Sequence, residues 1–174
     1  VNLNGGSVDT LAQTYNGATA LGADTALDAG GGDVTFNGAV SGEHSLTVDA
    51  GNININGASV DTLAQTYNGA VSLDVDTVLS SHGGDVTFNG AVTGLNDLLT
   101  VEAGGGVINL NGGSVNTYTQ TYNGAVALGA DTVLSSRGGD VNFGGAVSGS
   151  HYLTIDTSEG VVNVNGGSVN TYTQ

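Results

Sequence analysis

The chain has 174 residues, a formal net charge of −15, 31 glycines and a single basic residue, Arg137. It has no cysteine, which excludes disulfides and thiolate metal sites, and its charge argues against binding to nucleic acid or to an anionic membrane surface. Methionine is absent and no apolar run approaches the ~18 residues of a membrane span, so we interpret the sequence as a piece of a longer chain that is not inserted in a membrane.

A long internal repeat organises the chain from its first residues onward. The string Gln-Thr-Tyr-Asn-Gly begins at Gln13 and returns at Gln65 and Gln120, at spacings of 52 and 55 residues. The string Gly-Asp-Val-x-Phe returns at the same two spacings, and an Asn-Gly-x-Ser-Val string occurs four times. We therefore expect one segment with three full repeats and a partial fourth. The approximate boundaries of these repeats are 1–52, 53–107, 108–161 and 162–174.

Within each repeat, short predicted strands alternate with tight corners. Residues 85–89 (Asp-Val-Thr-Phe-Asn) and 107–111 (Val-Ile-Asn-Leu-Asn) alternate apolar and polar side chains, which is typical of a strand with one buried face. An Asn-Gly or Gly-Gly corner follows such strands ten times, and both residue types tolerate the backbone conformations of turns. These corners come directly after Leu3, Tyr15, Phe36, Ile55, Tyr67, Phe88, Leu110, Tyr122, Phe143 and Val164.

Short strands that return in the same order on every pass predict an all-β fold, a parallel β-helix (β-solenoid) without α-helices. The alternatives are an antiparallel meander joined by Asn-Gly hairpins, a barrel, or a disordered glycine-rich array. The absence of proline favours the solenoid, because interior strands donate hydrogen bonds on both sides. Recurring asparagines such as Asn109 and Asn111 are expected to stack into amide ladders.

The number of coils follows from the spacing of neighbouring strands, about 4.8 Å. At about 18–20 residues per coil, the chain would form roughly nine coils and a rod on the order of 45 Å long. The corners, however, are separated by about 21, 20 and 12 residues in rotation, and a 12-residue gap is too short for such a coil. Whether one repeat makes two larger coils or three smaller ones is left open by the sequence.

Several strings resemble the repeats of filamentous-haemagglutinin-type surface proteins, which are very long bacterial adhesins. They are Ile-Asn-Ile-Asn-Gly at 53–57, Val-Thr-Phe-Asn-Gly-Ala-Val at 86–92, Ser-Val-Asn-Thr at 114–117 and the run from Gln-Thr-Tyr-Asn-Gly to Asp-Thr at 120–132. The resemblance covers essentially the whole chain and implies a right-handed β-helical shaft at the extracellular bacterial cell surface. In that family adhesion depends on separate modules or exposed loops, and neither an export domain nor an adhesive module is recognisable here.

The candidate chemical groups do not form a recognisable catalytic pattern. The chain has three histidines, His44, His82 and His151, and the first and last occupy equivalent corners where the middle repeat has Asn96. Nothing resembles a nucleophile elbow or a base with an orienting partner. We expect exposed corner residues, no catalytic or cofactor-binding site, and no enzyme.

Acidic and aromatic residues recur at the repeat spacing and are interpreted as columns along the shaft. The acidic sets are Asp24, Asp76 and Asp131; Asp33, Asp85 and Asp140; and Asp49, Glu102 and Asp156. Members of one column would lie on the order of 10–15 Å apart, which does not suit the paired carboxylates of a glycoside hydrolase. The tyrosines at 15, 67 and 122 would form an aromatic column able to stack on sugars or to pack in the shaft.

Calcium is the only cofactor considered, and it is not assigned to any residue. The Gly-Asp corners at Asp33 and Asp85 distantly resemble the calcium-binding nonapeptides of parallel β-rolls, but the nine-residue period is absent. The expected function is that of a structural shaft or filament segment, whose partners are further copies of the repeat in the same chain or stacked end to end as a fibre. The alternative is an adhesin module that binds glycan or another surface ligand at the corners 43–44, 96–97 and 150–151 or through the tyrosine column.

Overall fold

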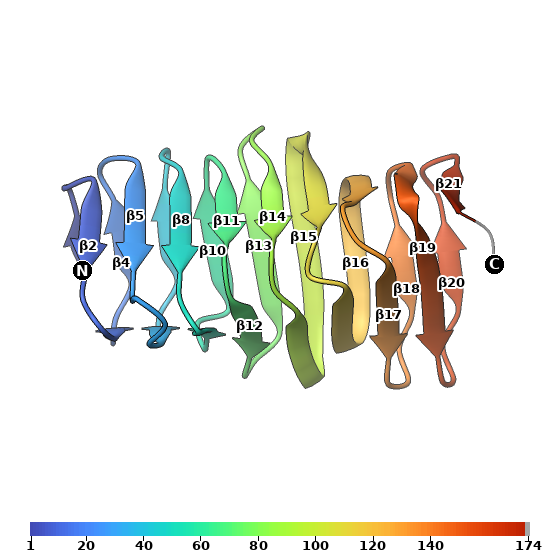
Figure 1. Cartoon of the computed structure of the whole chain (residues 1–174), viewed down its shortest axis with the longest axis horizontal. Helices are drawn as coiled ribbons and strands as arrows, with labels where there is room; N and C mark the ends of the chain where they lie inside the picture. The colour runs from blue at the N-terminus through green and yellow to red at the C-terminus, as the bar shows by residue number, and fades with distance from the viewer. Residues whose placement is uncertain (173–174) are drawn as a thin grey trace.

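The structure, a computed structural model, describes residues 1–172. These residues form 21 strands and no helix, and all the strand pairings are parallel. The strands wind around one axis into a right-handed β-solenoid of about 8 turns, with the two termini at opposite ends (Figure 1). The predicted parallel solenoid is confirmed, and an antiparallel meander is excluded because neighbouring strands run in the same direction.

The strands are short except where one continues around a corner. In chain order they are β1 (Asn2–Leu3), β2 (Ser7–Asp9), β3 (Gln13–Tyr15), β4 (Thr19–Leu21), β5 (Thr25–Asp28), β6 (Val34–Phe36), β7 (Val40–Gly42), β8 (Leu46–Asp49), β9 (Asn52–Ile55), β10 (Ser59–Thr62), β11 (Gln65–Tyr67), β12 (Ala70–Leu73), β13 (Thr77–Ser81), β14 (Val86–Phe88), β15 (Val92–Leu110), β16 (Ser114–Leu128), β17 (Thr132–Ser136), β18 (Val141–Phe143), β19 (Val147–Thr157), β20 (Val162–Val164) and β21 (Val169–Tyr172).

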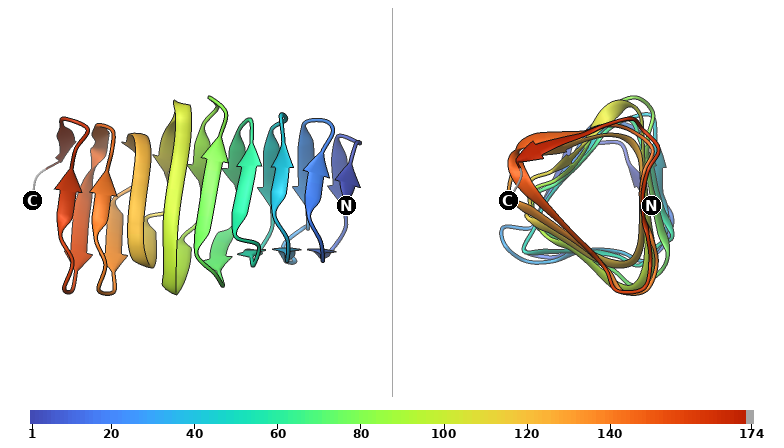
Figure 2. Two further views of the ribbon diagram at one scale, coloured as in Figure 1. Left: turned by 180° about the vertical axis from the view of Figure 1, so that it is seen from behind. Right: turned by 90° about the vertical axis from the view of Figure 1, so that its right-hand side faces the viewer.

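Seen along its axis, the solenoid is a triangle with three flat faces (Figure 2). The first face contains β1, β4, β7, β10, β13, the middle of β15 and β16, β18 and β20. The second face contains β2, β5, β8, β11, β14 and the last part of β15 and β16, and continues through the start of β19 to β21. The third face contains β3, β6, β9, β12, the first part of β15 and β16, β17 and the end of β19.

The core is the narrow bore inside the triangle. Each strand points alternate side chains inward, so that in β6 Val34 and Phe36 are fully buried while Thr35 between them faces outward. Ile53 and Ile55 of β9 continue the same pattern on the next coil. Because each strand supplies only two or three inward side chains, the bore is filled mainly by valine, leucine and isoleucine, together with one tyrosine and one phenylalanine from each full repeat.

One repeat contains eight strands, whereas one coil contains three. Tyr15 ends β3 and its repeat equivalent Tyr67 ends β11, eight strands later. Pairs such as Leu3 with Leu21 and Val92 with Val115 put 18 to 23 residues in a coil, so a 52-residue repeat spans two and two-thirds coils. Neither two larger nor three smaller coils is correct. Each repeat therefore starts one face before the face on which the preceding repeat started, because eight strands fall one strand short of three complete turns.

The eight strands of a repeat are distinguished by their inward residues, and we name each strand type after its copy in the second repeat. In chain order the types are Ile-x-Ile (53–55), Val-x-Thr (60–62), Gln-x-Tyr (65–67), Val-x-Leu (71–73), Thr-x-Leu (77–79), Val-x-Phe (86–88), Val-x-Gly (92–94) and Leu-x-Val (99–101).

Along each face these types follow one another in a fixed sequence, which we call the axial order. It runs Gln-x-Tyr, Val-x-Phe, Ile-x-Ile, Val-x-Leu, Val-x-Gly, Val-x-Thr, Thr-x-Leu and Leu-x-Val, after which Gln-x-Tyr returns. This is every third type in chain order, as three strands per coil require. The sequence repeat thus preserves the contacts between successive coils while the faces change.

The Asn-Gly corners stack through both of their residues. The side-chain amide of Asn111 donates to Oδ1 of Asn89 at 2.8 Å, and Asn89 donates to Asn68 at 2.7 Å, which confirms the predicted amide ladder at Asn111. The prediction is wrong for Asn109, whose amide donates to Oγ1 of Thr87 at 3.1 Å. The glycine has a steric role rather than a conformational one. A Cβ at Gly90 would overlap the carbonyl oxygen of Gly69 on the preceding coil, and the φ of Gly90 is not positive. These glycines are therefore required because they leave room for the neighbouring coil, and not because they adopt positive φ.

Candidate functional site

The most elaborate polar arrangement lies inside the bore and joins a glutamine to a tyrosine. The Tyr67 hydroxyl donates to Oε1 of Gln65 at 2.9 Å, and Nε2 of Gln65 donates to the carbonyl oxygens of Val60 at 3.1 Å and Ser80 at 2.8 Å. Both side chains are fully buried, and burial raises the pKa of the Tyr67 hydroxyl. The amide satisfies two backbone carbonyls at the corners, so the network ties together strands of two successive coils.

The same network occurs once in every repeat and on a different face each time. Gln13 with Tyr15 and Gln120 with Tyr122 reproduce its hydrogen bonds. Each tyrosine also stacks on the phenylalanine of the next coil, with ring centroids 5.4–5.5 Å apart and planes 15–16° from parallel. The predicted tyrosine column is therefore wrong. The three rings lie on three faces and are buried, so their faces are not available to stack on a sugar.

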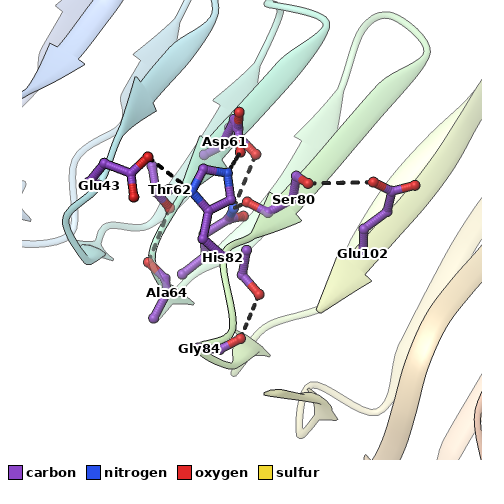
Figure 3. A network of polar contacts seen from close by, with 11 residues as sticks. Glu43, Asp61, Thr62, Ala64, Ser80, His82, Gly84 and Glu102 are labelled. Atoms are coloured by element: carbon purple, nitrogen blue, oxygen red, sulfur yellow. Dashed lines mark hydrogen bonds and ion pairs between the residues drawn. The ribbon is translucent and has the colours of Figure 1, made fainter. Parts of the chain in front are cut away.

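The most concentrated exposed charge surrounds His82 at the end of β13 (Figure 3). Its Nε2 lies 2.6 Å from Oδ1 of Asp61 on the preceding coil, and its Nδ1 lies 3.4 Å from Oε1 of Glu43, one coil further back. On the other side, Ser80 donates to Oε2 of Glu102 at 3.4 Å. The hydrogen bond to Glu43 and the charge of Asp61 raise the pKa of His82 above its ordinary value. The imidazole therefore connects three coils when it is protonated.

The other two histidines lie beside an aspartate on corners of their own. His44 Nδ1 is 3.7 Å from Asp24, and His151 Nδ1 is 3.4 Å from Asp131. Although His44 and His151 are equivalent in the repeat, they lie on different corners of the triangle, because successive repeats are rotated around the axis. No described histidine is paired with a hydroxyl nucleophile, and an enzymatic role is neither supported nor tested by this geometry.

Most of the recurring aspartates fasten one coil to the next. Asp24 Oδ1 accepts the backbone N–H of Ser45 at 2.9 Å, and Asp85 Oδ1 accepts the N–H of Val107 at 2.8 Å. Their repeat equivalents form the same bond: Asp76 with Leu98, Asp131 with Tyr152 and Asp140 with Val161. Members of each predicted acidic set nevertheless lie on different corners or faces of the triangle, so the predicted columns are wrong.

A true acidic column exists at a place that repeat spacing does not reveal. Asp9, Asp28 and Asp49 are directly paired on successive strands of the second face. They occupy different strand types, so the repeat alignment never places them together. The signal that could have found them is the axial order, which requires the number of strands per coil. Within residues 1–172 there is no group of three or more His, Asp or Glu side chains that could hold a metal ion, and calcium binding stays a prediction.

A surface hollow of about 390 Å³ lies at the variable corner of the middle repeat. It is lined by 72–74 and 93–97. Burial, together with the nearby charges of Asp76 and Asp74, raises the pKa of Asp97. Because the corner is acidic and open, it can present carboxylates and amides to a ligand, but it does not enclose the ligand.

Comparisons with known proteins found no match to this chain. No protein family, no curated protein and no solved structure matches it. None of the described segments is a helix long and apolar enough to cross a membrane. The resemblance to filamentous-haemagglutinin-type repeats accordingly stays a prediction, and the fold rests on the strand pairings described above.

Proposed function

We propose that the protein is a structural shaft, a rigid spacer segment of an extracellular bacterial surface protein. The observation that supports this most directly is the unbroken parallel ladder on all three faces, from the first coil to the last (Figure 1). Every interior coil is hydrogen-bonded to the one before and the one after, so bending the shaft requires backbone hydrogen bonds to be strained along one side.

The outer surface suits a spacer that stays separate from its neighbours. The chain contains sixteen acidic residues and a single arginine. The acidic side chains at the corners point away from the bore. Like charges on neighbouring shafts repel one another, which opposes lateral association of the three faces. The extracellular bacterial location is supported by the resemblance of the repeats alone.

A spacer is tested by its length. The chain has no native cysteine, so spin labels can be placed through Ala20→Cys and Asn123→Cys. These positions lie five pairing steps apart on the first face, which predicts a narrow distance distribution near 24 Å before the length of the labels is added. A flexible chain of the same length would give a broad distribution around 50–60 Å.

Duplication of residues 53–107 provides the decisive measurement. It adds eight strands, so a shaft must become longer by about 13 Å, and a second duplication must add the same increment. Small-angle scattering of the three lengths measures this. An increment that falls with each added repeat, as in a collapsed or flexible array, would rule out the spacer function.

An adhesin module is the second candidate, and the variable corner favours it. Residues 43–44, 96–97 and 150–151 differ between repeats, and the hollow of about 390 Å³ lies beside the middle pair. Because the repeats rotate, the three corners point in three directions, which would present ligand sites around the shaft. Binding of the chain to a glycan array, lost in an Asn96→Ala, Asp97→Ala variant, would support this function, and no binding to any sugar would eliminate glycan as its ligand.

A further inference from the structure

Arg137 is the only arginine in a chain without lysine, and it lies on an exposed corner directly after β17. Its Nε donates to Oδ1 of Asn116 on the preceding coil at 3.3 Å. Within residues 1–172 it forms no ion pair with a carboxylate, although the chain contains sixteen acidic residues. Strands pair with β17 on both sides, so the residues around Arg137 come from three successive coils.

The second repeat has the same corner with its charge balanced inside the chain. There a histidine, His82, stands in place of the arginine and contacts Asp61 and Glu43 (Figure 3). In the third repeat the two equivalent positions hold neutral residues, Asn116 and Leu95. Both carboxylates that neutralise the histidine are replaced around the arginine, whose charge therefore stays available to an anion from outside.

The guanidinium borders a surface hollow of about 260 Å³. All of its lining residues are polar: Asn116, Ser135, Ser136, Arg137, Asp156 and Ser158. The Ser136 hydroxyl donates to the carbonyl oxygen of Gly139, whereas Ser135 and Ser158 are not buried. The hollow thus combines one planar cation with hydroxyl, amide and carboxylate groups, which are the groups that exchange hydrogen bonds with a polyol.

An exposed aromatic ring lies next to this corner. Tyr118 belongs to the preceding coil and is 43% exposed. A Cβ on Gly138, the residue after Arg137, would lie 3.2 Å from Cε2 of this ring, so the ring and the guanidinium belong to one surface. The first two repeats have Leu11 and Leu63 in place of the tyrosine. Of the three full repeats, the third therefore combines the arginine with an aromatic neighbour.

We propose that this corner binds an acidic saccharide and that Arg137 holds the carboxylate of the sugar. A guanidinium presents parallel N–H donors that match a carboxylate in a bidentate pair. Ser135 and Asp156 then bond to hydroxyl groups of the sugar, and the ring of Tyr118 packs against its C–H face. This binding activity goes beyond the function of a shaft and does not depend on it.

Asp156 distinguishes a sugar acid from a small inorganic anion. It is paired in register with Ser135 and lines the same hollow. A sulfate or phosphate ion beside Arg137 has no donor to offer Asp156 and is repelled by its charge. A sugar acid is larger, so its carboxylate can contact the arginine while one of its hydroxyl groups donates to Asp156. Because the net charge of −15 opposes any anion, we expect binding at millimolar sugar concentrations.

The single arginine gives a direct readout, because its Nε–H produces one signal in a nitrogen–proton NMR spectrum. Titration with methyl glucuronide should shift this signal to saturation. Methyl glucoside, which has a hydroxymethyl group in place of the carboxylate, should leave the signal unshifted, and acetate and sulfate should bind at least about tenfold more weakly. No shift with the glucuronide, or equal shifts with the glucoside, would overturn the proposal. Acetate or sulfate binding as tightly as the glucuronide would overturn the assignment to a saccharide.

A matched pair of substitutions tests whether the site is local. Asn116→Asp supplies the carboxylate of the second repeat without changing the arginine. The new carboxylate pairs with the guanidinium and repels the sugar, so the affinity for methyl glucuronide should fall about fivefold or more. Asn54→Asp is the same change in the same outward column of the third face, three pairing steps or about 14 Å away, and should leave the affinity unchanged. Equal losses would contradict a local site.

A transplant into the second repeat keeps the proposal testable if Asn116→Asp alters the fold. Glu43→Leu, Asp61→Asn and His82→Arg together reproduce the neutral surroundings of the arginine. Ser80 and Glu102 already correspond to the serine and the aspartate of the hollow. The added arginine should give a second Nε–H signal that methyl glucuronide shifts, whereas H82R alone keeps both carboxylates and should give a signal that does not respond. The same response in both variants, or none in the triple variant, would overturn the proposal.

The binding site and the shaft are tested separately. Neither the spin-label measurement nor the duplication of 53–107 involves Arg137, so the shaft can stand when this inference fails.

Discussion

At the scale of single residues, polar groups in the bore and on the corners hold neighbouring coils in register. The Gln–Tyr network is the interior example, because one buried amide satisfies a hydroxyl and two carbonyls. The aspartates are the exterior example, since each accepts a backbone N–H of the following coil. Apolar packing alone would tolerate slippage of one coil against the next, whereas these directional contacts do not.

The interior network can be tested with Gln65→Leu. The substitution leaves the Tyr67 hydroxyl and the carbonyls of Val60 and Ser80 without their partner in a dry bore, so we expect a loss of about 1–3 kcal/mol in the free energy of unfolding. Urea titration followed by circular dichroism measures it. Gln13→Leu at the partly open first coil, where water can replace the amide, should cost clearly less, and equal losses would argue against the buried network.

The exposed cluster predicts a pH dependence. The pKa of His82 is raised in the folded chain above the ordinary 6.5, first by the hydrogen bond to Glu43 and then by the charge of Asp61. Stability from this histidine is therefore present in full below about pH 6.5 and is lost as the pH rises through the raised value. Thermal unfolding should show His82→Gln lowering Tm at pH 5.5 and leaving it unchanged at pH 9.

The third repeat supplies the matched control for that experiment. Arg137 occupies the position of His82 and contacts Asn116, which stands where the second repeat has Asp61. Because arginine stays charged, His82→Arg should keep the contact at both pH values and remove the pH dependence. A His82→Gln effect of equal size at pH 5.5 and pH 9 would contradict the role of the protonated imidazole.

At the scale of the strand and corner, the close stacking of coils limits which residues can turn the chain. The Asn-Gly corners illustrate this, because the asparagine joins the amide ladder while the glycine lets the next corner approach. The same dipeptide in a hairpin would serve a different purpose, namely positive φ. The distinction could not be made from the sequence, since both uses select the same residues.

A pair of glycine substitutions separates the steric role from the conformational one. Gly90→Ala places a methyl group against the Gly69 carbonyl and should destabilise the chain by about 1–3 kcal/mol. Gly17→Ala is the same change in the same kind of corner on the first coil, where nothing lies within 4 Å, and should be neutral or stabilise by about 0.4–1 kcal/mol. Denaturant midpoints measure both, and a destabilising Gly17→Ala would show that the corner needs glycine for its backbone.

At the scale of the whole molecule, successive repeats are rotated around the axis of the shaft, because a repeat has eight strands and a coil has three. Residues that are equivalent in sequence return to the same face only after three repeats. The bulky Tyr–Phe pairs are thereby distributed over all three faces and do not widen one side of the bore. A shaft built in this way stays straight and presents the same average surface in every direction.

Deletions of different size test this arrangement. Removal of residues 53–107 takes out eight strands and preserves every contact type between coils, so Tm should fall only slightly. Removal of 70–91 takes out β12, β13 and β14, one complete coil, and replaces the Tyr67–Phe88 contact with a pair that occurs nowhere in the chain. Despite being the smaller deletion it should lower Tm more, and calorimetry showing the reverse would refute the axial order as a source of stability.

Patterns in the sequence were enough to predict the class of fold, the short strands, the corners and the amide ladder of the corner asparagines. Each of these depends on neighbouring residues, on a repeating string, or on the absence of proline, and such signals are local. The sequence also led to the expectation of no enzyme, which the geometry leaves untested. It failed on the tyrosine and acidic columns, because residues one repeat apart were assumed to share a face.

Which residues become neighbours across coils follows from the three-dimensional winding of the chain and not from the repeat spacing. That depends on how many strands complete one turn, and the number of strands per turn is set by how sharply the corners bend around the packed bore. Three sides and eight strands have no common factor, so the 52-residue spacing that dominates the sequence is not the spacing along the shaft. For this reason Asp9, Asp28 and Asp49 are neighbours, while Tyr15 and Tyr67 lie on different faces.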